Sequence, residues 1–206
     1  KDILPLQGYK PALHAAAVEV ELGPVKEAFP NKIFPLGVVH EFICPAAEDA
    51  VASGGFISGI LSSLMKTGGT CLWISTSRTI FPPALPSFGI EPDKIIFIYL
   101  QKEKEILWTM EEALKCDGLA AVVGEIQELS FMVSRRLQLA VEQSRVTGFI
   151  IRRNPRNCST TACVTRWKIS SAPSELNDDM PGVGFPTWNV ELLKIRNGKP
   201  GSWTIE

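Results

Sequence analysis

Hydrophobic residues along the chain fall into two patterns. Short, almost wholly apolar runs are typical of strands buried in a parallel sheet, and apolar residues at every third or fourth position are typical of helices that cover it. The run 94–100 is apolar enough to predict a strand covered on both faces. Because strands and helices largely alternate, the sequence predicts an α/β fold with a mostly parallel sheet. The predicted strands are residues 38–44, 71–75, 94–100, 119–125 and 148–152, and the predicted helices are residues 50–65, 103–115 and 129–144.

The pattern changes near the C-terminus. Apolar and polar residues alternate over residues 163–169, which is the period of a strand with one exposed face, and Trp167 falls on its core side. Residues 171–187 predict a long loop, and residues 188–195 and 202–206 predict a hairpin. This part of the chain therefore predicts antiparallel strands at one edge of the sheet.

The N-terminal residues form a separate segment. An extended arm leads into a predicted helix over residues 11–22, which Gly23-Pro24 would end, and a short helical turn to Phe29 follows. We therefore divide the chain into an N-terminal arm and helical segment, residues 1–35, and a core domain, residues 36–206.

The junction between the first predicted strand and the next helix is where nucleotide-binding α/β proteins hold a phosphate. They use a glycine-rich loop, a lysine and a Ser/Thr on Mg²⁺, but G-x-x-x-x-G-K-[ST] occurs nowhere in this chain. The acidic residues here would repel a phosphate, and Asp49 is expected to be the N-cap of the helix. The residues at this degenerate phosphate-loop position are Pro45, Glu48, Asp49 and Ala50.

Composition and charge favour a single-core domain and argue against a protein that is basic over its whole surface. A chain of 206 residues with 45% hydrophobic content can bury roughly 70% of its unfolded surface in one core. A formal net charge of −1 and a pI near 6.2 give no overall basic footprint for nucleic acid, so any DNA contact would be local.

The cysteine and hydropathy patterns bear on location and cofactors. Five cysteines without a C-x-x-C pair, with two histidines, predict reduced thiols and no metal site. No apolar run reaches the length of about 18 residues that a membrane span needs, and no signal peptide is visible. We therefore expect a cytoplasmic protein without a cofactor, a metal or a membrane contact.

Trp108 lies on the polar side of the predicted helix 103–115. The apolar positions of this helix form one stripe, and Trp108 falls opposite them, among lysines and glutamates. A tryptophan on a charged face is either covered by a neighbouring loop or anchors an interface with a partner. The sequence leaves both interpretations open.

An arginine falls within the apolar stripe of the predicted helix 129–144. Helical geometry places Arg136 in that stripe, and a buried arginine needs a carboxylate partner. Glu125, at the end of the preceding predicted strand, is the candidate for this structural ion pair.

Five basic residues lie within or after the fifth predicted strand and together could contact DNA phosphates or an acidic partner surface. The alternative is a solvated edge of the sheet, where such residues are common. Trp167 is the one aromatic residue among them, and its predicted core position argues against base stacking. The basic residues are Arg152, Arg153, Arg156, Arg166 and Lys168.

Four segments carry a resemblance to a known family. They read WTMEEALKCDGLAAVVGEI at 108–126, SRRLQLAVEQSRVTGFIIR at 134–152, TRWKISSAPS at 165–174 and WNVELLKIRNGKPGSW at 188–203. Together they resemble the ImuA family, and the resemblance covers most of the chain from residue 36 onwards. It implies a RecA-like three-layer core, similar also to the division inhibitor SulA, with antiparallel strands at the C-terminal edge.

The ImuA family accompanies an ImuB-type Y-family polymerase homologue and an error-prone replicative-type polymerase in bacterial damage-induced (SOS) mutagenesis. The resemblance therefore implies a non-catalytic adaptor in translesion synthesis that binds the ImuB-like protein, RecA or both. Trp108 and the Arg152–Arg156 loop are the expected contacts. A SulA-like division inhibitor and a direct binder of single-stranded DNA are the alternatives, and self-association through RecA-like packing is a further expectation.

The resemblance to RecA also bears on ATP hydrolysis. Laid on the RecA phosphate loop, this sequence has Asp49 at the second glycine, Ala50 at the lysine and Val51 at the threonine. Without the lysine and the Mg²⁺ ligand, phosphoryl transfer has no stabiliser, so we expect no ATP hydrolysis. Glu125 stands near the acidic metal residue of such ATPases, and we expect a structural role for it. A small α/β enzyme of another kind is disfavoured because the chain lacks a nucleophile elbow and a usable pair of histidine and carboxylate.

Overall fold

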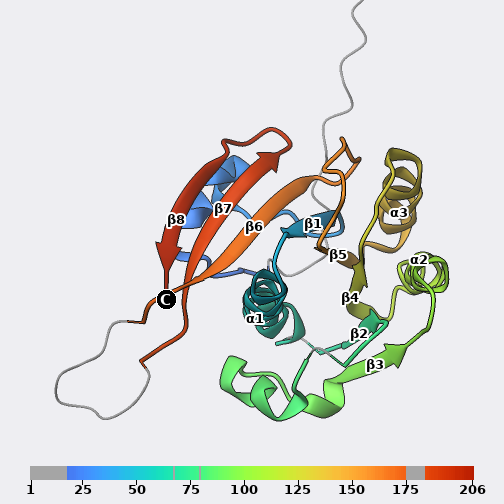
Figure 1. The fold of residues 1–206 in the computed structure, drawn as a ribbon, viewed down its shortest axis with the longest axis horizontal. Helices are drawn as coiled ribbons and strands as arrows, with labels where there is room; N and C mark the ends of the chain where they lie inside the picture. Colours follow the sequence, from blue (N-terminus) through green and yellow to red (C-terminus); the bar gives the residue numbers. More distant parts are fainter. Residues whose placement is uncertain (1–17, 67, 79, 175–183) are drawn as a thin grey trace, which may run out of the picture.

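The computed structural model describes residues 18–66, 68–78, 80–174 and 184–206, and Figure 1 shows how its elements are arranged. The helices and strands are β1 Val39–Cys44, α1 Ala47–Met65, β2 Thr70–Ser75, β3 Ile95–Tyr99, α2 Glu103–Ala113, β4 Leu119–Ile126, α3 Phe131–Ser144, β5 Thr147–Arg153, β6 Thr165–Ala172, β7 Thr187–Ile195 and β8 Gly201–Ile205. The 3₁₀ helices are η1 Gly23–Ala28, η2 Pro30–Lys32, η3 Pro82–Phe88 and η4 Pro92–Lys94.

A single mixed sheet runs through the molecule in the order β3-β2-β4-β5-β1-β6-β7-β8. The neighbours from β3 to β6 are parallel, whereas β7 pairs antiparallel with β6 and β8 pairs antiparallel with β7. The predicted α/β fold, mostly parallel with antiparallel C-terminal edge strands, is confirmed. The change of direction comes one strand later than the alternating pattern indicates, because β6 is still parallel to β1.

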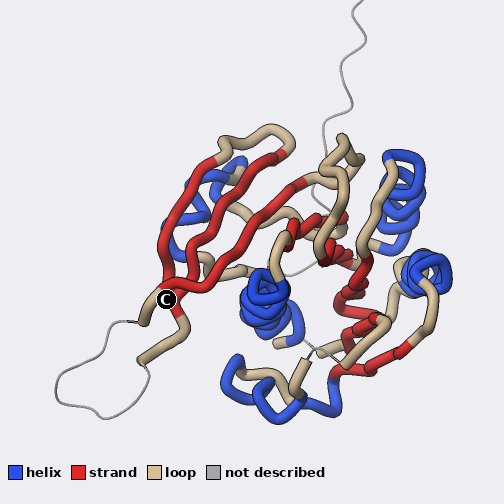
Figure 2. The backbone as a smooth tube through the Cα atoms, in the orientation of Figure 1, coloured by secondary structure: helices blue, strands red, loops and turns tan. Residues whose placement is uncertain are grey.

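Helices cover both faces of the sheet (Figure 2). On the α1 side, Phe42, Phe149 and Trp167 belong to one large core. On the other side, where α2 and α3 pack, Met110 and Ile150 belong to a second core. The central strands therefore have two buried faces, which is why their sequences are mostly apolar.

Strand β3 is less buried than its sequence indicates. The run 94–100 predicts a strand covered on both faces, but β3 is the edge of the sheet and Ile96 is 50% exposed. The chain between β2 and β3 forms the short 3₁₀ helices η3 and η4 instead of a full crossover helix. The prediction of complete burial is wrong because an edge strand has a neighbour on one side only.

The segment before β1 packs on the α1 side of the sheet. The helix expected over residues 11–22 is wrong for residues 18–22, which are not helical, and its earlier part lies outside the described residues. Gly23 and Pro24 begin the 3₁₀ helix η1 rather than ending a helix, since proline is favoured in a first turn. The expected helical turn before Phe29 is confirmed, and the Phe29 ring lies 6.0 Å from that of Trp167.

Candidate functional site

The connection between β1 and α1 is very short. β1 ends at Cys44 and α1 begins at Ala47, so only Pro45 and Ala46 link them. A phosphate-binding loop needs several residues between strand and helix, because its backbone N–H groups must surround the phosphate. The junction therefore lacks the length of such a loop as well as its glycines and its lysine.

The first turn of α1 carries negative charge. Glu48 and Asp49 lie in it, and Ala50 follows directly. Asp49 is wrongly predicted as the N-cap: the cap is Ala46, and Asp49 Oδ2 accepts a hydrogen bond from the Ala46 N–H at 3.0 Å. A carboxylate of the chain thus satisfies a backbone donor at the place where a bound phosphate would accept one, and its charge favours the helix N-terminus.

A shallow hollow lies beside this junction, at the carboxyl ends of the parallel strands. Its ionisable groups are the carboxylates of Glu103 and Glu125 and the guanidinium of Arg153. Glu103 Oε1 accepts a hydrogen bond from the backbone N–H of Gln127, which ties the start of α2 to the end of β4. Two carboxylates against one guanidinium leave the hollow without the positive charge that a triphosphate needs.

Glu125 is held by side chains of the protein. Its Oε1 accepts a hydrogen bond from the indole Nε1 of Trp73 at 2.7 Å. Arg153 Nη1 lies 3.5 Å from Oε2 and also donates to Ser77 Oγ at 3.0 Å. The carboxylate near the metal position of RecA-like ATPases therefore joins β2, β4 and β5, which is a structural arrangement.

The predicted ion pair between Arg136 and Glu125 is wrong. The Arg136 side chain is 60% exposed, and its guanidinium donates to the Glu111 carboxylate on α2. Arg136 and Glu125 lie on opposite faces of the sheet, since Glu125 bonds Trp73 of the α1-side core while α3 covers the other face.

The orientation of α3 explains this error. Met132, which the apolar pattern places on the buried stripe, is 72% exposed. The buried face includes the polar Ser134 and Gln138, and both bond to backbone: Ser134 Oγ accepts from Ala162 N at 2.9 Å, and Gln138 Oε1 accepts from Val39 N at 3.1 Å. Hydrophobic periodicity places polar residues such as Ser134 and Gln138 on the exposed face of a helix. The buried face of α3 is therefore rotated about the helix axis relative to the prediction.

Arg152 is not available to a partner. Its side chain is fully buried, and Nη1 lies 2.9 Å from Oε1 of the equally buried Glu41 on β1. Nη2 donates to the backbone carbonyl of Asn157 at 2.6 Å and lies 3.4 Å from the Glu128 carboxylate. Because every nitrogen of this group faces a protein acceptor, Arg152 has a structural role and its assignment as a contact residue is wrong.

Arg166 belongs to the same buried network. Its Nε donates to Glu41 Oε2 at 2.8 Å, and Thr161 Oγ1 donates to the same oxygen at 2.7 Å. Glu41 was not singled out in the sequence, although a carboxylate inside an apolar strand always needs a partner of opposite charge. That single charged position in the run 38–44 was the signal that could have found this network.

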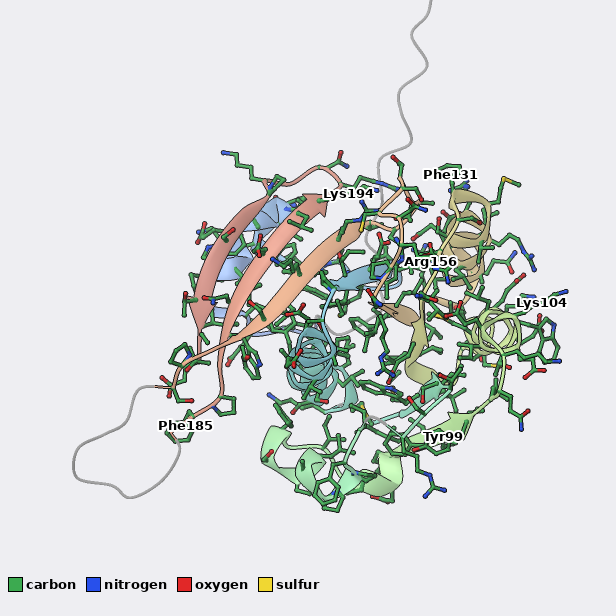
Figure 3. The ribbon with its side chains drawn as sticks, in the orientation of Figure 1. Tyr99, Lys104, Phe131, Arg156, Phe185 and Lys194 are labelled. Atoms are coloured by element: carbon green, nitrogen blue, oxygen red, sulfur yellow. The ribbon has the colours of Figure 1, made fainter. Side chains whose placement is uncertain are left out.

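The other basic candidates lie nearer the surface. Arg153 is partly exposed above Glu125, and Lys168 pairs across the strands with Glu191 at 2.9 Å. Arg156 is exposed in the loop after β5, where Figure 3 labels it. The structure thus divides the predicted cluster into the fully buried Arg152, the mostly buried Arg166, which is 15% exposed, and three groups nearer the surface.

The loop between β5 and β6 is anchored along its length. Its start is held by Arg156 N, which donates to Glu128 Oε1 at 2.8 Å. Its end is held by Lys194 Nζ, which donates to the carbonyls of Thr161 and Cys163 at 2.8 and 3.0 Å. Desolvation lowers the pKa of this lysine. The backbone of the loop is therefore fixed, while the Arg156 side chain projects from it.

The buried histidine and cysteines are poor candidates for acid–base or nucleophilic catalysis. His40 stacks between Phe34 and Phe149, and burial lowers its pKa to about 3. Burial likewise raises the pKa of the Cys44 thiol to about 11 and that of Cys163 to about 12, so neither is a ready nucleophile. Among the described residues, no group of three or more His, Cys, Asp or Glu side chains is placed to hold a metal ion.

Trp108 is 64% exposed on α2. The described loops do not cover it, which removes one of the two interpretations left open by the sequence. A tryptophan with this much free surface on a rigid helix has the properties of an interface anchor.

Comparisons with known proteins agree with the fold and the sequence segments. No protein-family profile matches the chain. Protein ImuA from two strains of Caulobacter vibrioides, NA1000/CB15N and ATCC 19089/CB 15, is 33% identical over 190 residues, which is 86% of this chain and 78% of that protein. The cell division inhibitor SulA of Photorhabdus laumondii is 30% identical over 100 residues, covering 47% of this chain and 56% of that protein.

A solved structure gives the fold. The crystal structure of the RadB recombinase superposes with a TM-score of 0.56 at 15% identity and covers 84% of this chain and 88% of that one. The expected RecA-like architecture is therefore confirmed. No helix within the described ranges has both the length and the apolar character to cross a bilayer. With one third of its residues shared over most of both sequences, the chain belongs to the ImuA family.

Proposed function

We propose that this protein is a non-catalytic accessory protein of damage-induced, error-prone translesion DNA synthesis. It acts as an adaptor that binds an ImuB-like polymerase homologue, RecA, or both, and through them serves an error-prone replicative-type polymerase. Membership of the ImuA family supports the process, and the RecA-like fold supports a partner from the recombination machinery. The observation that carries the non-catalytic part is the two-residue connection from β1 to α1.

The chemistry of that junction supports the proposed absence of ATP hydrolysis. Phosphoryl transfer requires positive groups and a metal ion around the transferred phosphate. The junction offers Glu48 and Asp49 instead, and the nearest guanidinium, Arg153, is already paired with Glu125. A triphosphate here would meet repulsion and no replacement for its lost hydration.

Two surfaces are the contacts of the proposed adaptor. One is Trp108 on α2, and the other is the loop after β5 with Arg156 and the partly exposed Arg153. Tryptophan and arginine are enriched among interface hot spots, and on an anchored backbone only their side chains lose conformational freedom on binding.

Co-elution tests the adaptor function directly. The chain is mixed with a full-length ImuB-like polymerase homologue and, separately, with RecA, and each mixture is run on a size-exclusion column. We expect the wild type to co-elute with one of them and Trp108→Ala or Arg156→Glu to weaken that complex. Phe81→Ala and Lys32→Glu, which alter an exposed aromatic and an exposed cation on the α1 side of the sheet, are the matched controls. Separate elution of the wild type from both partners would refute the proposal.

Two alternatives have specific support. The exposed Arg156 and the partly exposed Arg153 and Lys168 favour a direct contact with single-stranded DNA, which would appear as salt-dependent binding of an oligonucleotide that Arg156→Glu weakens. The similarity to SulA favours a division inhibitor, which would appear as binding to the tubulin-like division protein. Both assays use the same purified chain.

A further inference from the structure

Three consecutive backbone carbonyls in the loop between β5 and β6 face guanidinium groups of the strands. Arg152 Nη2 donates to the carbonyl of Asn157 at 2.6 Å. Arg166 Nη1 and Nη2 donate to the carbonyls of Cys158 and Ser159 at 3.4 and 2.6 Å. Three acceptors in a row are thus turned towards the protein.

The N–H groups of the same peptides point the other way. In a planar trans peptide the C=O and N–H bonds are antiparallel, and the described residues contain no cis peptide bond. The N–H groups of Cys158, Ser159 and Thr160 therefore point away from the two guanidiniums, in a stretch where every residue from 156 to 160 is exposed. No acceptor among the described residues bonds to these three N–H groups. We call residues 156–160 the donor segment.

The donor segment is held in this orientation by charged side chains. Arg152 and Arg166 both pair with the buried carboxylate of Glu41, at 2.9 and 2.8 Å. At the start of the segment, Glu128 Oε1 accepts a hydrogen bond from the Arg156 N–H at 2.8 Å. Because the backbone is fixed before a ligand arrives, binding through its N–H groups costs little conformational freedom. Successive exposed backbone N–H groups are a recurring means of binding an anion.

The charge around the donor segment also favours an anion. Five cationic side chains belong to the loop between β5 and β6 or bond to it, namely Arg152, Arg156, Arg166, Lys194 and Arg196. Two carboxylates, those of Glu41 and Glu128, bond to the same loop. The positive groups therefore outnumber the negative ones.

The small number of exposed cations favours a carboxylate over a nucleic acid. Among the five, Arg156 and Arg196 are exposed. Arg152 is fully buried and Arg166 is 15% exposed. A nucleic acid is bound by several exposed lysines and arginines along its phosphates. A carboxylate needs one guanidinium and a few N–H donors, which is what the donor segment offers.

We infer that the donor segment binds a carboxylate of the partner protein, from an Asp or Glu side chain, through the N–H groups of residues 158–160 and the Arg156 guanidinium. This inference rests on the proposed adaptor function and names the chemistry that the partner presents. Arg152 and Arg166 are positioning residues, because they touch the loop carbonyls and not the partner.

The surroundings of the donor segment leave room for such a side chain. A shallow hollow lies between Asn157–Ser159 and Glu128–Ser130. The Glu128 carboxylate in this hollow is compensated, since one oxygen accepts from the Arg156 N–H and the other lies 3.4 Å from Arg152 Nη2. It therefore opposes an incoming carboxylate less than a free glutamate would.

A proline variant tests the role of the backbone, because proline lacks the N–H group. The full chain carrying Thr160→Pro is titrated calorimetrically with the full-length ImuB-like polymerase homologue and, separately, with RecA. We expect its binding to the partner that the wild type recognises to weaken about 10-fold or more, since a hydrogen bond to a charged group is lost. Thr160→Ala keeps the N–H group and loses the side chain, so this matched control should bind like the wild type.

A second variant tests the guanidinium. Arg156→Gln is expected to weaken the same complex about 10-fold and to reduce its dependence on salt. Lys32→Gln, which neutralises an exposed cation on the α1 side of the sheet, is the control and should bind like the wild type. Circular dichroism and the melting temperature establish that each variant is folded.

Amide resonances report on the donor segment of the unsubstituted chain. The isotope-labelled full chain is titrated with sodium acetate and, at the same ionic strength, with sodium chloride. We expect acetate to shift the amide resonances of residues 158–160 in a saturable way, and chloride to leave them in place. Resonances that acetate does not move would overturn the inference, whether or not Thr160→Pro folds.

The remaining outcomes also decide between occupants. Wild-type affinity in a folded Thr160→Pro or in Arg156→Gln would overturn the inference and leave the adaptor function standing. If the wild type binds neither partner, the adaptor function in this form fails and the inference fails with it. If a thymidine oligonucleotide binds and Thr160→Pro weakens that binding, the ligand is a nucleic acid and the inference of a partner carboxylate is overturned.

Discussion

Arg152 and Glu41 form an ion pair that neither side chain exposes to solvent, with 2.9 Å between Nη1 and Oε1. The pair connects β5 to β1, and Arg166 extends it to β6. Three neighbouring strands are thus joined by charges on the side of the sheet opposite α1. The loop after β5 rests on this network through the Asn157 carbonyl.

Removing one member of this pair should strongly destabilise the folded protein. Arg152→Ala leaves Glu41 buried with half of its compensation lost, and breaking such a pair costs about 3–5 kcal/mol of unfolding free energy. Urea denaturation followed by circular dichroism measures this change in unfolding free energy. Arg156→Ala, at an exposed position of the same loop, should change stability by less than about 0.5 kcal/mol. A loss below about 1 kcal/mol in Arg152→Ala would contradict a buried network.

The carboxylate at the start of α1 should stabilise that helix. Asp49→Ala removes both the hydrogen bond from Ala46 N–H and the favourable charge, at a cost of about 0.5–2 kcal/mol. Glu48→Ala removes a charge alone from the same turn and should cost less, about 0.3–1 kcal/mol. Equal losses in the two variants would show that the hydrogen bond contributes nothing.

His40 should make stability depend on pH. Its pKa is about 3 in the folded protein, because burial disfavours the charged ring, against 6.5 when it is unfolded. Between these values the unfolded chain binds a proton that the folded chain does not, so unfolding becomes easier as pH falls through this window. The stability contributed by the neutral ring is fully present above pH 6.5 and falls by as much as about 4–5 kcal/mol towards pH 3.

Comparison with His40→Gln isolates this effect from the carboxylates that titrate in the same range. The variant is less stable at neutral pH, because it loses the aromatic stacking on Phe34 and Phe149. Its stability should nevertheless fall less steeply between pH 6.5 and 4.5 in urea titrations. Parallel curves for the two proteins would refute the assignment to His40.

Nucleotide should leave the protein unchanged. Anything that binds the folded state raises the melting temperature, so millimolar ATP with Mg²⁺ should give no shift and no phosphate release. RecA, assayed in parallel, is the positive control. Stoichiometric ATP binding whose turnover disappears in Glu125→Gln would contradict the proposed loss of catalysis.

The two tryptophans on α2 and β6 should behave in opposite ways. Trp108→Ala should change unfolding free energy by less than about 0.5 kcal/mol, because the side chain is mostly exposed. Trp167→Ala should cost about 3–5 kcal/mol, because its ring is fully buried against Phe42 and Phe56. A large loss in Trp108→Ala would mean that binding defects of this variant report unfolding.

Much of the fold could be predicted from hydrophobic periodicity. The central strands, the C-terminal hairpin and the core position of Trp167 agree with the structure because burial on one or both faces dictates those patterns. The edge position of β3 could not be predicted, since strand order depends on long-range pairing that local sequence does not encode. The rotation of α3 was missed because Ser134 and Gln138 are buried polar residues.

The candidate site was harder to predict than the fold. The missing lysine at Ala50 is plain in the sequence, but the shortness of the junction appears only when α1 is seen to begin at Ala47. The partners of Arg136, Arg152 and Arg166 lie 25, 111 and 125 positions away along the chain. The order of the strands and the rotation of the helices decide which carboxylate lies beside which arginine. The spacing of residues along the sequence reveals neither of them.

The short junction between β1 and α1 also constrains how this protein can change. Placing lysine and threonine at positions 50 and 51 would put both inside a continuous helix, with no loop before them to enclose a phosphate. A nucleotide site here would need an inserted loop and a displaced helix start. Intermediate loop lengths would disturb the hydrogen bond from Ala46 N–H to Asp49 without creating a binding loop. Single substitutions therefore offer no gradual route to a phosphate-binding loop at this junction, and variation in this protein is expected to concentrate on its outer surfaces.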